Sequence, residues 1–277
     1  MSSDTRSRRR KASVRDFLDM KREGRRIVAM TAYDVLFAGL LEQAGVDIIL
    51  VGDSLGQVVL GYDSTLPVTM DDMIHHASAV RRGARSTFVV LDMPFLTYQV
   101  TQDEAVRNAG RAMKEAGVEA VKIEGGDERA CATVQRFVAA GIPVMGHIGL
   151  TPQSVHALGG YRIQGRGQEA ADRIRREAKA LEEAGAFAMV LELVPAALAA
   201  QISASLTIPT IGIGAGSGCD GQVLVVYDAL GLNKGFEPKF LKRFADLHGA
   251  ALEGIKTYAQ EVRDGSYPGP EHSFDEG

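Results

Sequence analysis

Five ionisable residues occupy equivalent places along the chain, each near the end of an apolar stretch that resembles a β-strand. They are Asp53, Asp92, Glu124, His147 and Glu192. All but Asp92 follow an Ala-Gly pair, such as Ala44-Gly45, whose glycine is suited to ending the preceding helix in a left-handed conformation. Late positions of parallel strands meet at one rim of a barrel. We therefore expect the five side chains to converge, although they are far apart in the sequence.

Carboxylates gathered at one rim repel one another unless a cation joins them. A set of oxygen ligands favours Mg²⁺, which takes a few carboxylates and completes its shell with water and substrate. Zinc is disfavoured, because neither Cys131 nor Cys219 falls in the rim pattern. Lys122 lies two positions before Glu124, so the alternation of a strand puts both side chains on one face. For His147 two roles stay open, a contact with substrate and a structural hydrogen bond.

The chain has eight strand-like runs, and the five ionisable residues lie at or near the ends of five of them. Most of the runs are continuously apolar, as in buried parallel strands. The runs are Ile27–Thr31, Asp47–Gly52, Thr87–Met93, Ala120–Gly125, Val144–Gly149, Ala188–Val194, Thr210–Gly216 and Val223–Asp228. Helix-like stretches with start signals alternate with them, and a short helix beginning at Ser13 precedes the first. Eight alternations predict a (β/α)8 barrel, with a doubly wound open sheet as the alternative.

Composition limits the class of protein. The chain has 277 residues, of which 45% are hydrophobic and 24% charged, as expected for a globular protein with one large domain. Its net charge of −4 is uneven, since residues 1–26 carry ten Lys or Arg against four Asp or Glu. We interpret residues 1–12 as a disordered basic tail and residues 13–277 as a single catalytic barrel domain. The acidic remainder has no basic stripe for a nucleic acid.

Other features point to a cytoplasmic enzyme. No apolar run reaches the roughly 18 residues of a membrane span, and the N-terminus has no signal-peptide core. Two cysteines far apart in the sequence form no disulfide framework, which suits a reducing compartment. We expect no membrane partner.

Several long motifs, in order, strongly resemble the ketopantoate hydroxymethyltransferase family. The first is Val51-Gly52-Asp53-Ser54-Leu55-Gly56, followed by Gly61-Tyr62-Asp63-Ser64-Thr65-Leu66-Pro67-Val68-Thr69. The others occupy residues 31–34, 92–95, 121–126, 146–155, 159–166, 211–216, 220–222 and 271–274. The resemblance extends from about residue 13 to residue 274. One departure is Leu96-Thr97, where the family often has smaller residues.

This resemblance implies a (β/α)8 TIM barrel of the phosphoenolpyruvate/pyruvate type that acts in pantothenate, and hence coenzyme A, biosynthesis. The implied reaction transfers a one-carbon unit from 5,10-methylenetetrahydrofolate to 3-methyl-2-oxobutanoate and forms 2-dehydropantoate. It also implies Mg²⁺ held by Asp53 and Asp92, with Glu124 at the metal directly or through water. Ser54, Lys122 and the two aspartates would contact the keto acid, Glu192 would accept the proton, and the protein would form a homodecamer.

The chemistry of a 2-oxo acid agrees with this assignment. Its carboxylate and keto oxygens can chelate one cation, which stabilises the enolate formed when C3 loses a proton. The base must face C3 from outside the metal shell, and Glu192 is the remaining rim acid.

Two alternatives are kept. One is a Mg²⁺-dependent lyase like isocitrate lyase or phosphoenolpyruvate mutase, but the Lys-Lys-Cys-Gly-His loop of those enzymes does not occur around Cys131 or Cys219. The other is a non-catalytic binding barrel, which loss of the rim acids would favour, and all of them are present.

Overall fold

The computed structural model describes residues 10–274, which form two compact units that divide after Val225. The first unit contains a closed barrel of parallel strands in the order of the chain, β1 to β8, with β8 paired to β1. This confirms the predicted (β/α)8 barrel. Its strands are β1 (Ile27–Thr31), β2 (Ile48–Val51), β3 (Phe88–Asp92), β4 (Ala120–Lys122), β5 (Val144–Gly149), β6 (Ala188–Glu192), β7 (Thr210–Ile213) and β8 (Gly221–Leu224).

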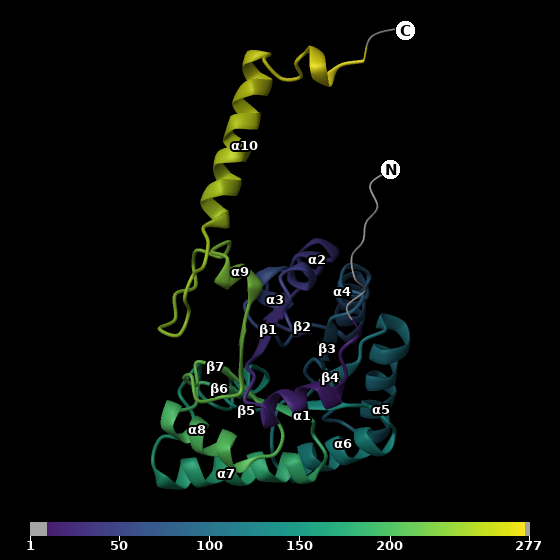
Figure 1. The fold of residues 1–277 in the computed structure, drawn as a ribbon, viewed down its shortest axis with the longest axis vertical. Helices are drawn as coiled ribbons and strands as arrows, with labels where there is room; N and C mark the ends of the chain where they lie inside the picture. The colour runs from purple at the N-terminus through teal and green to yellow at the C-terminus, as the bar shows by residue number, and fades with distance from the viewer. Residues whose placement is uncertain (1–9, 275–277) are drawn as a thin grey trace. The chain divides into compact units, whose positions relative to one another are not determined.

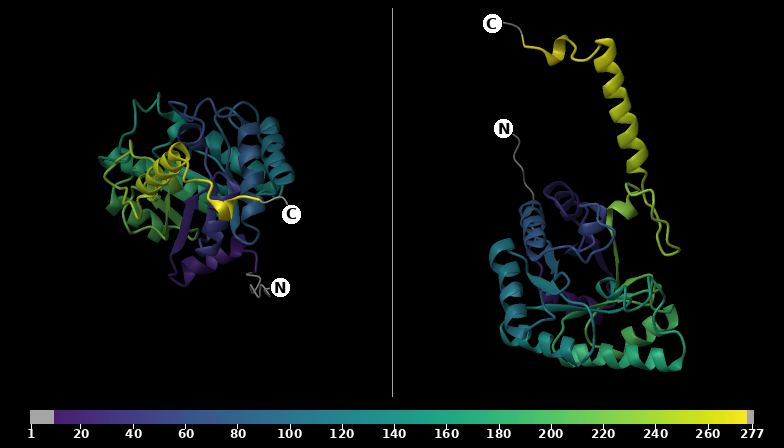
Figure 2. Two further views of the ribbon diagram at one scale, coloured as in Figure 1. Left: turned by 90° about the horizontal axis from the view of Figure 1, so that it is seen from above. Right: turned by 180° about the vertical axis from the view of Figure 1, so that it is seen from behind.

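Helices connect the strands, and the larger ones, α4 to α8, lie outside the sheet (Figures 1 and 2). The helices of the first unit are α1 (Val14–Arg22), α2 (Val35–Gln43), α3 (Leu55–Val58), α4 (Met70–Gly83), α5 (Gln102–Arg111), α6 (Glu128–Ala139), α7 (Gln168–Glu183) and α8 (Ala196–Ser205). A π-helical turn, η1 (Ala112–Ala116), continues α5, and a 3-10 turn, η2 (Pro152–Ser154), follows β5. The glycines of the four Ala-Gly pairs all have positive φ, as predicted.

The last strand begins two residues earlier than the sequence pattern predicts. The expected run was Val223–Asp228, whereas β8 starts at Gly221 and Val226–Ala229 forms a short helix, α9. Gly221 pairs with both Ile27 and Ile211, and a Cβ at this position would lie 2.4 Å from the Ile27 carbonyl oxygen. The strand therefore starts at a position that only glycine can occupy. Because glycine is not part of the apolar pattern, that pattern does not reveal where the strand starts.

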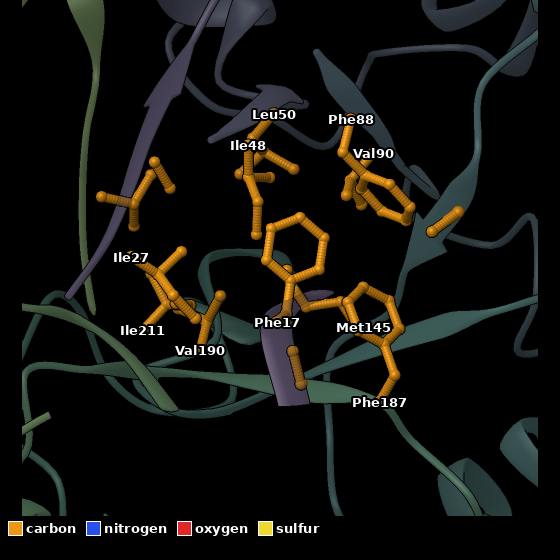
Figure 3. Packing of buried hydrophobic residues seen from close by; sticks show 14 of the residues in the cluster. Phe17, Ile27, Ile48, Leu50, Phe88, Val90, Met145, Phe187, Val190 and Ile211 are labelled. Atoms are coloured by element: carbon orange, nitrogen blue, oxygen red, sulfur yellow. The ribbon is translucent and has the colours of Figure 1, made fainter. Parts of the chain in front are cut away.

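Helix α1 closes the end of the barrel at which the strands begin. It starts with the predicted capping box between Ser13 and Asp16. Its Phe17 is 1% exposed and packs edge-on against Phe88 at the start of β3, with ring centroids 5.0 Å apart, and 6.2 Å from Phe187 (Figure 3). Because this apolar plug fills one end, the carboxyl ends of the strands provide the open rim.

The N-terminal residues that the structure describes also contact the barrel unit. Lys11 pairs with Glu119, and the backbone nitrogen of Ala12 donates to the carbonyl of Ser86. The rest of the predicted basic tail, residues 1–9, lies outside the described residues. The disordered tail and the single domain over 13–277 stay predictions.

The second unit contains α9, the long helix α10 (Leu247–Asp264) and the 3-10 turn η3 (Pro270–His272). Asp246 caps α10 by accepting a hydrogen bond from the backbone of Gly249, and Gly265 ends it with positive φ. Within residues 10–274, no helix has both the length and the apolar character required to cross a membrane.

The plug formed by Phe17 predicts a large loss of stability when its ring is removed. For Phe17→Ala we expect the free energy of unfolding to fall by about 3–5 kcal/mol, because the cavity lies among packed aromatic rings. Urea denaturation followed by circular dichroism measures the change. Leu36→Ala is the control, since Leu36 is 75% exposed and should change stability by less than about 0.5 kcal/mol. Equal effects of both substitutions would contradict the role of α1.

Candidate active site

The structure brings the predicted rim residues together at the carboxyl ends of five neighbouring strands. Asp92 and Glu192 are the last residues of β3 and β6, and His147 lies within β5. Asp53 and Glu124 each come two residues after the end of their strands, β2 and β4. Five of the six ionisable residues here, counting Lys122, are almost completely removed from water, with exposed fractions between 2% and 7%. Glu192 is the more accessible one, with 16% of its side chain exposed.

A continuous series of polar contacts links five of the six side chains, all but that of Asp53. The Lys122 ammonium lies 2.6 Å from Asp92 Oδ1 and 3.8 Å from Glu124 Oε1. On the other side of Glu124, its Oε1 atom lies 3.5 Å from Nδ1 of His147. The opposite ring nitrogen, Nε2, lies 3.3 Å from Glu192 Oε2. Lys122 therefore faces the aspartates, and His147 separates this group from Glu192.

Asp53 joins the series through the backbone and a neighbouring loop. Its amide nitrogen lies 3.5 Å from Asp92 Oδ2, and its own Oδ2 accepts a hydrogen bond of 2.9 Å from the side-chain amide of Gln153. Ser54, the next residue, shares a 2.8 Å hydrogen bond with the Tyr33 hydroxyl. Asp53 and Ser54 thus lie side by side at the end of β2, as the sequence pattern predicts.

Burial and mutual repulsion dominate the electrostatics of this group. Burial raises the pKa of Asp53 well above its usual range, and the charges of Asp92 and Glu124 raise it further. Burial also raises the pKa of Asp92 in spite of Lys122. The pKa of Lys122 is raised, because the three carboxylates outweigh the effect of its burial. The ionised forms of the two aspartates are therefore disfavoured, because the single lysine does not fully offset burial and repulsion.

His147 lies between two carboxylates from different strands. Burial and the charge of Lys122 act to lower the pKa of His147, but its interactions with Glu124 and Glu192 prevail and raise that pKa to about 9. In turn, the interaction with His147 and the charge of Lys122 lower the pKa of Glu124, although burial opposes them. The structure places the imidazole between Glu124 and Glu192, and both roles considered for His147 stay predictions.

The backbone around Glu192 is constrained on both sides. The carbonyl of Glu192 accepts a 2.8 Å hydrogen bond from the nitrogen of Leu150. Gly149, the residue before Leu150, has a φ of +94°. A Cβ on Gly149 would lie 2.2 Å from the carbonyl oxygen of Glu192. Leu193, directly after Glu192, has a φ of +46°, which is uncommon for a residue with a side chain. Strained conformations of this kind cluster at functional sites.

Sequence reasoning did not single out Gln153, which contacts two of the carboxylates, or Tyr98, which contacts Gln153 and the backbone of Glu124. Gln153 follows β5, and its backbone nitrogen donates to Glu124 Oε2 at 3.0 Å. The Tyr98 hydroxyl accepts a hydrogen bond from the backbone nitrogen of Glu124 and donates to Gln153 Oε1. Gln153 lies in the 3-10 turn η2 and Tyr98 in the segment after β3, and their neutral side chains gave no charge signal. In the loop that departs from the family, Leu96 has a φ of +63° and is 52% exposed.

Among residues 10–274, no group of three or more His, Cys, Asp or Glu side chains is arranged as a ready-made metal cage. The donor set is nevertheless suited to a hard cation, because Asp53, after β2, and Asp92, at the end of β3, are buried carboxylates whose ionised forms repel each other and would be stabilised by positive charge. Mg²⁺ in particular is usually held by one or two carboxylates, with water and substrate supplying the other ligands. A cavity of about 390 Å³ at the start of α7, lined by Arg166, Arg173 and Arg176 among others, contains none of these carboxylates.

Comparison with known proteins gives a consistent result. The family model of ketopantoate hydroxymethyltransferase matches residues 11–270. A 3-methyl-2-oxobutanoate hydroxymethyltransferase from Syntrophus aciditrophicus (strain SB) is 56% identical over 270 residues, covering 98% of this chain and 99% of the relative. Another protein of that name, from Heliobacterium modesticaldum (strain ATCC 51547 / Ice1), is 57% identical over 256 residues and covers 92% of each chain.

Solved structures with similar folds are much more distant in sequence. A phosphonopyruvate hydrolase in complex with oxalate and Mg²⁺ has a TM-score of 0.61 and 16% identity, covering 94% of this chain and 92% of that chain. A 2,3-dimethylmalate lyase, described as a member of the PEP mutase/isocitrate lyase superfamily, has a TM-score of 0.59 and 19% identity, covering 93% and 92%. At these identities the likeness shows the barrel fold alone.

The buried ion pair between Lys122 and Asp92 predicts a large effect of removing the ammonium group. For Lys122→Met, measured without metal, we expect the free energy of unfolding to fall by about 3–5 kcal/mol, because a buried carboxylate loses its partner. Since folding raises the pKa of Lys122, this contribution is fully present below the ordinary lysine pKa. The contribution of the Lys122 ammonium group to stability is lost as the pH rises through the raised pKa of Lys122.

Guanidinium denaturation at neutral pH with a chelator measures this loss. The matched control is Lys234→Met, which removes a lysine that lies 2.7 Å from Asp246 in an exposed pair. An exposed pair of this kind contributes less than about 1 kcal/mol. Similar small losses in both variants would show that Lys122 is not required to balance buried charge.

Proposed function

This chain belongs to the ketopantoate hydroxymethyltransferase family, a family of transferase enzymes, and we propose that it transfers a hydroxymethyl group from 5,10-methylenetetrahydrofolate to 3-methyl-2-oxobutanoate. The product would be 2-dehydropantoate, in the biosynthesis of pantothenate. The observation that carries the proposal is the separation of two groups at one rim. Asp53, Asp92 and Lys122 form one group, and Glu192 lies apart from it beyond His147.

The first group has the properties of a site for a 2-oxo acid and a divalent cation. Asp53 and Asp92 would hold Mg²⁺, with Glu124 next to them directly or through water. Bound Mg²⁺ would polarise the keto group and stabilise the negative charge of the enolate. Burial and mutual repulsion disfavour the ionised forms of both aspartates, and a bound cation would relieve this cost, which supports a cation here.

Lys122 and Ser54 would orient the keto acid beside the aspartates. The Lys122 ammonium is the cation nearest to Asp92, so it can attract the substrate carboxylate while it balances the aspartates. The Ser54 hydroxyl is held by Tyr33 and offers a neutral hydrogen-bonding group at the same strand end. A charged and a neutral contact together would fix the substrate in one orientation.

Glu192 would remove the proton from C3 of the keto acid. It is separated from the aspartates by His147, so its carboxylate is not committed to the cation. The enolate of the keto acid would then form the new carbon–carbon bond to the methylene carbon of the folate as the bond from that carbon to one folate nitrogen breaks. Water would replace the second folate nitrogen, which leaves the hydroxymethyl group on the product and releases tetrahydrofolate. The side chain of Glu192 is 16% exposed, whereas the other rim residues are each at most 7% exposed. We therefore propose that the second substrate enters on the side of the rim where Glu192 lies.

Location and assembly remain part of the proposal. The two cysteines, Cys131 and Cys219, are free thiols, which is compatible with a cytoplasmic enzyme. The homodecamer stays a prediction that follows from the family. Light scattering of the purified protein would measure its mass.

Asp53→Asn tests the metal site. The change keeps the shape of the side chain but removes one charge from a hard-cation site, so we expect at least tenfold weaker Mg²⁺ binding. Activity should recover in part at high Mg²⁺. Isothermal titration calorimetry measures the affinity, and the exposed Asp264→Asn is the control. Wild-type activity after thorough chelation would refute the requirement for metal.

Glu192→Gln tests the base. The wild-type enzyme with Mg²⁺ should exchange the C3 proton of 3-methyl-2-oxobutanoate for deuterium in D₂O without folate, and proton NMR follows this exchange. In the variant we expect the exchange and the overall reaction to slow by about 10²–10⁴-fold, the usual contribution of a positioned base. Binding of the keto acid should persist. Exchange at the wild-type rate would assign the proton transfer to another group.

A further inference from the structure

The side chain of Gln153 is buried, with 5% of the residue exposed, and every hydrogen-bonding group of its amide is used. Its Nε2 donates to Asp53 Oδ2 and to the carbonyl of Met93, both at 2.9 Å. Its Oε1 accepts from the Tyr98 hydroxyl at 2.8 Å and from the side-chain amide of Gln99 at 3.2 Å. Two acceptors face the nitrogen and two donors face the oxygen, so the amide has one orientation that satisfies it.

Gln153 and Tyr98 also contact the backbone and side chain of Glu124. The nitrogen of Gln153 donates to Glu124 Oε2 at 3.0 Å, and the Tyr98 hydroxyl accepts from the nitrogen of Glu124 at 3.1 Å. One residue in the loop after β5 therefore bonds two carboxylates that come from β2 and β4. Networks in which each polar group is satisfied are rigid, and removing one member disturbs the others.

The partners of the two aspartates differ in charge. Asp92 is bound by the cationic Lys122, whereas Asp53 is bound by a neutral amide. A neutral donor restricts the rotation of a carboxylate without cancelling its charge. Asp53 therefore keeps its attraction for a cation while its orientation is fixed, which neither a lysine nor an apolar residue at position 153 would achieve.

We propose that Gln153, held in place by Tyr98, is a positioning residue that orients Asp53 for the metal and the keto acid. The inference rests on the function proposed above, because it assigns Asp53 to the metal. It concerns the support of the site and does not place Gln153 in contact with the substrate.

Gln153→Met removes the amide and keeps the length of the side chain. We expect it to bind Mn²⁺, used alone as the probe, about 10–100-fold more weakly, which is the usual effect of losing a group that orients a metal ligand. Electron paramagnetic resonance of free Mn²⁺ measures the affinity without substrate or turnover. Thermal unfolding of the same samples gives the folded fraction. Gln222→Met is the matched control, since that amide bonds the carbonyl of Gly216, and it should bind Mn²⁺ as the wild type does.

Tyr98→Phe is a second, milder test, because it keeps Gln153 and removes one hydroxyl, which fixes the amide and also accepts from the nitrogen of Glu124. We expect Mn²⁺ affinity to fall at least threefold, and the double variant to bind no more than a few-fold more weakly than Gln153→Met alone. Such non-additivity is expected when both residues act through one hydrogen bond. If Gln153→Met does not fold, the result for Tyr98→Phe decides.

Asp53→Asn, measured in parallel, separates the two proposals. If Asp53→Asn binds Mn²⁺ weakly but folded Gln153→Met binds it within twofold of the wild type, the positioning role is overturned and the metal site stands. If Asp53→Asn binds Mn²⁺ normally, both are overturned. A loss of stability in Gln153→Met with unchanged Mn²⁺ affinity would indicate a purely structural residue, and that result also overturns the inference.

Discussion

The mutual repulsion of carboxylates that are buried together is the constraint on which the rest of this structure depends. Asp53, Asp92 and Glu124 are each at most 7% exposed, so water cannot screen their charges. Isolated burial of one such charge is costly, and burial of several is tolerated only with partners. Lys122, His147 and the amide of Gln153 are those partners. Because they offset the repulsion only in part, the rim retains an affinity for positive charge.

The two ends of the barrel divide the tasks of stability and chemistry. At the end where the strands begin, Phe17 of α1 fills the interior with an aromatic cluster that holds no charge. At the other end, side chains that repel one another must be held at fixed distances. Strands paired in register supply this rigidity, and close backbone contacts such as Gly149 against Glu192 extend it beyond the sheet. A cluster of like charges is therefore supported by an apolar core that it does not contribute to.

Much of this arrangement could be predicted from the sequence, because a parallel barrel converts late strand position into spatial proximity. The apolar runs located seven strands closely, and the acids after Ala-Gly pairs converge as expected. The predicted start of β8 was wrong, because Gly221 is not part of the apolar pattern, although close packing requires glycine there. Gln153 and Tyr98 were missed for a related reason. Neutral hydrogen-bonding residues in loops become recognisable only when their partners are known.

The comparison of fold with family shows where the chemical identity of such a barrel lies. Proteins with 16–19% identity share the whole architecture yet are described as a hydrolase and a lyase. The strands alone therefore do not specify the reaction. In this chain the rim pairs Lys122 with Asp92 and places His147 between Glu124 and Glu192. His147 contacts Glu124 on one side and Glu192 on the other, so the imidazole separates the carboxylate proposed for proton transfer from those proposed for the cation. One buried imidazole from β5 thus bridges acidic residues at the ends of β4 and β6.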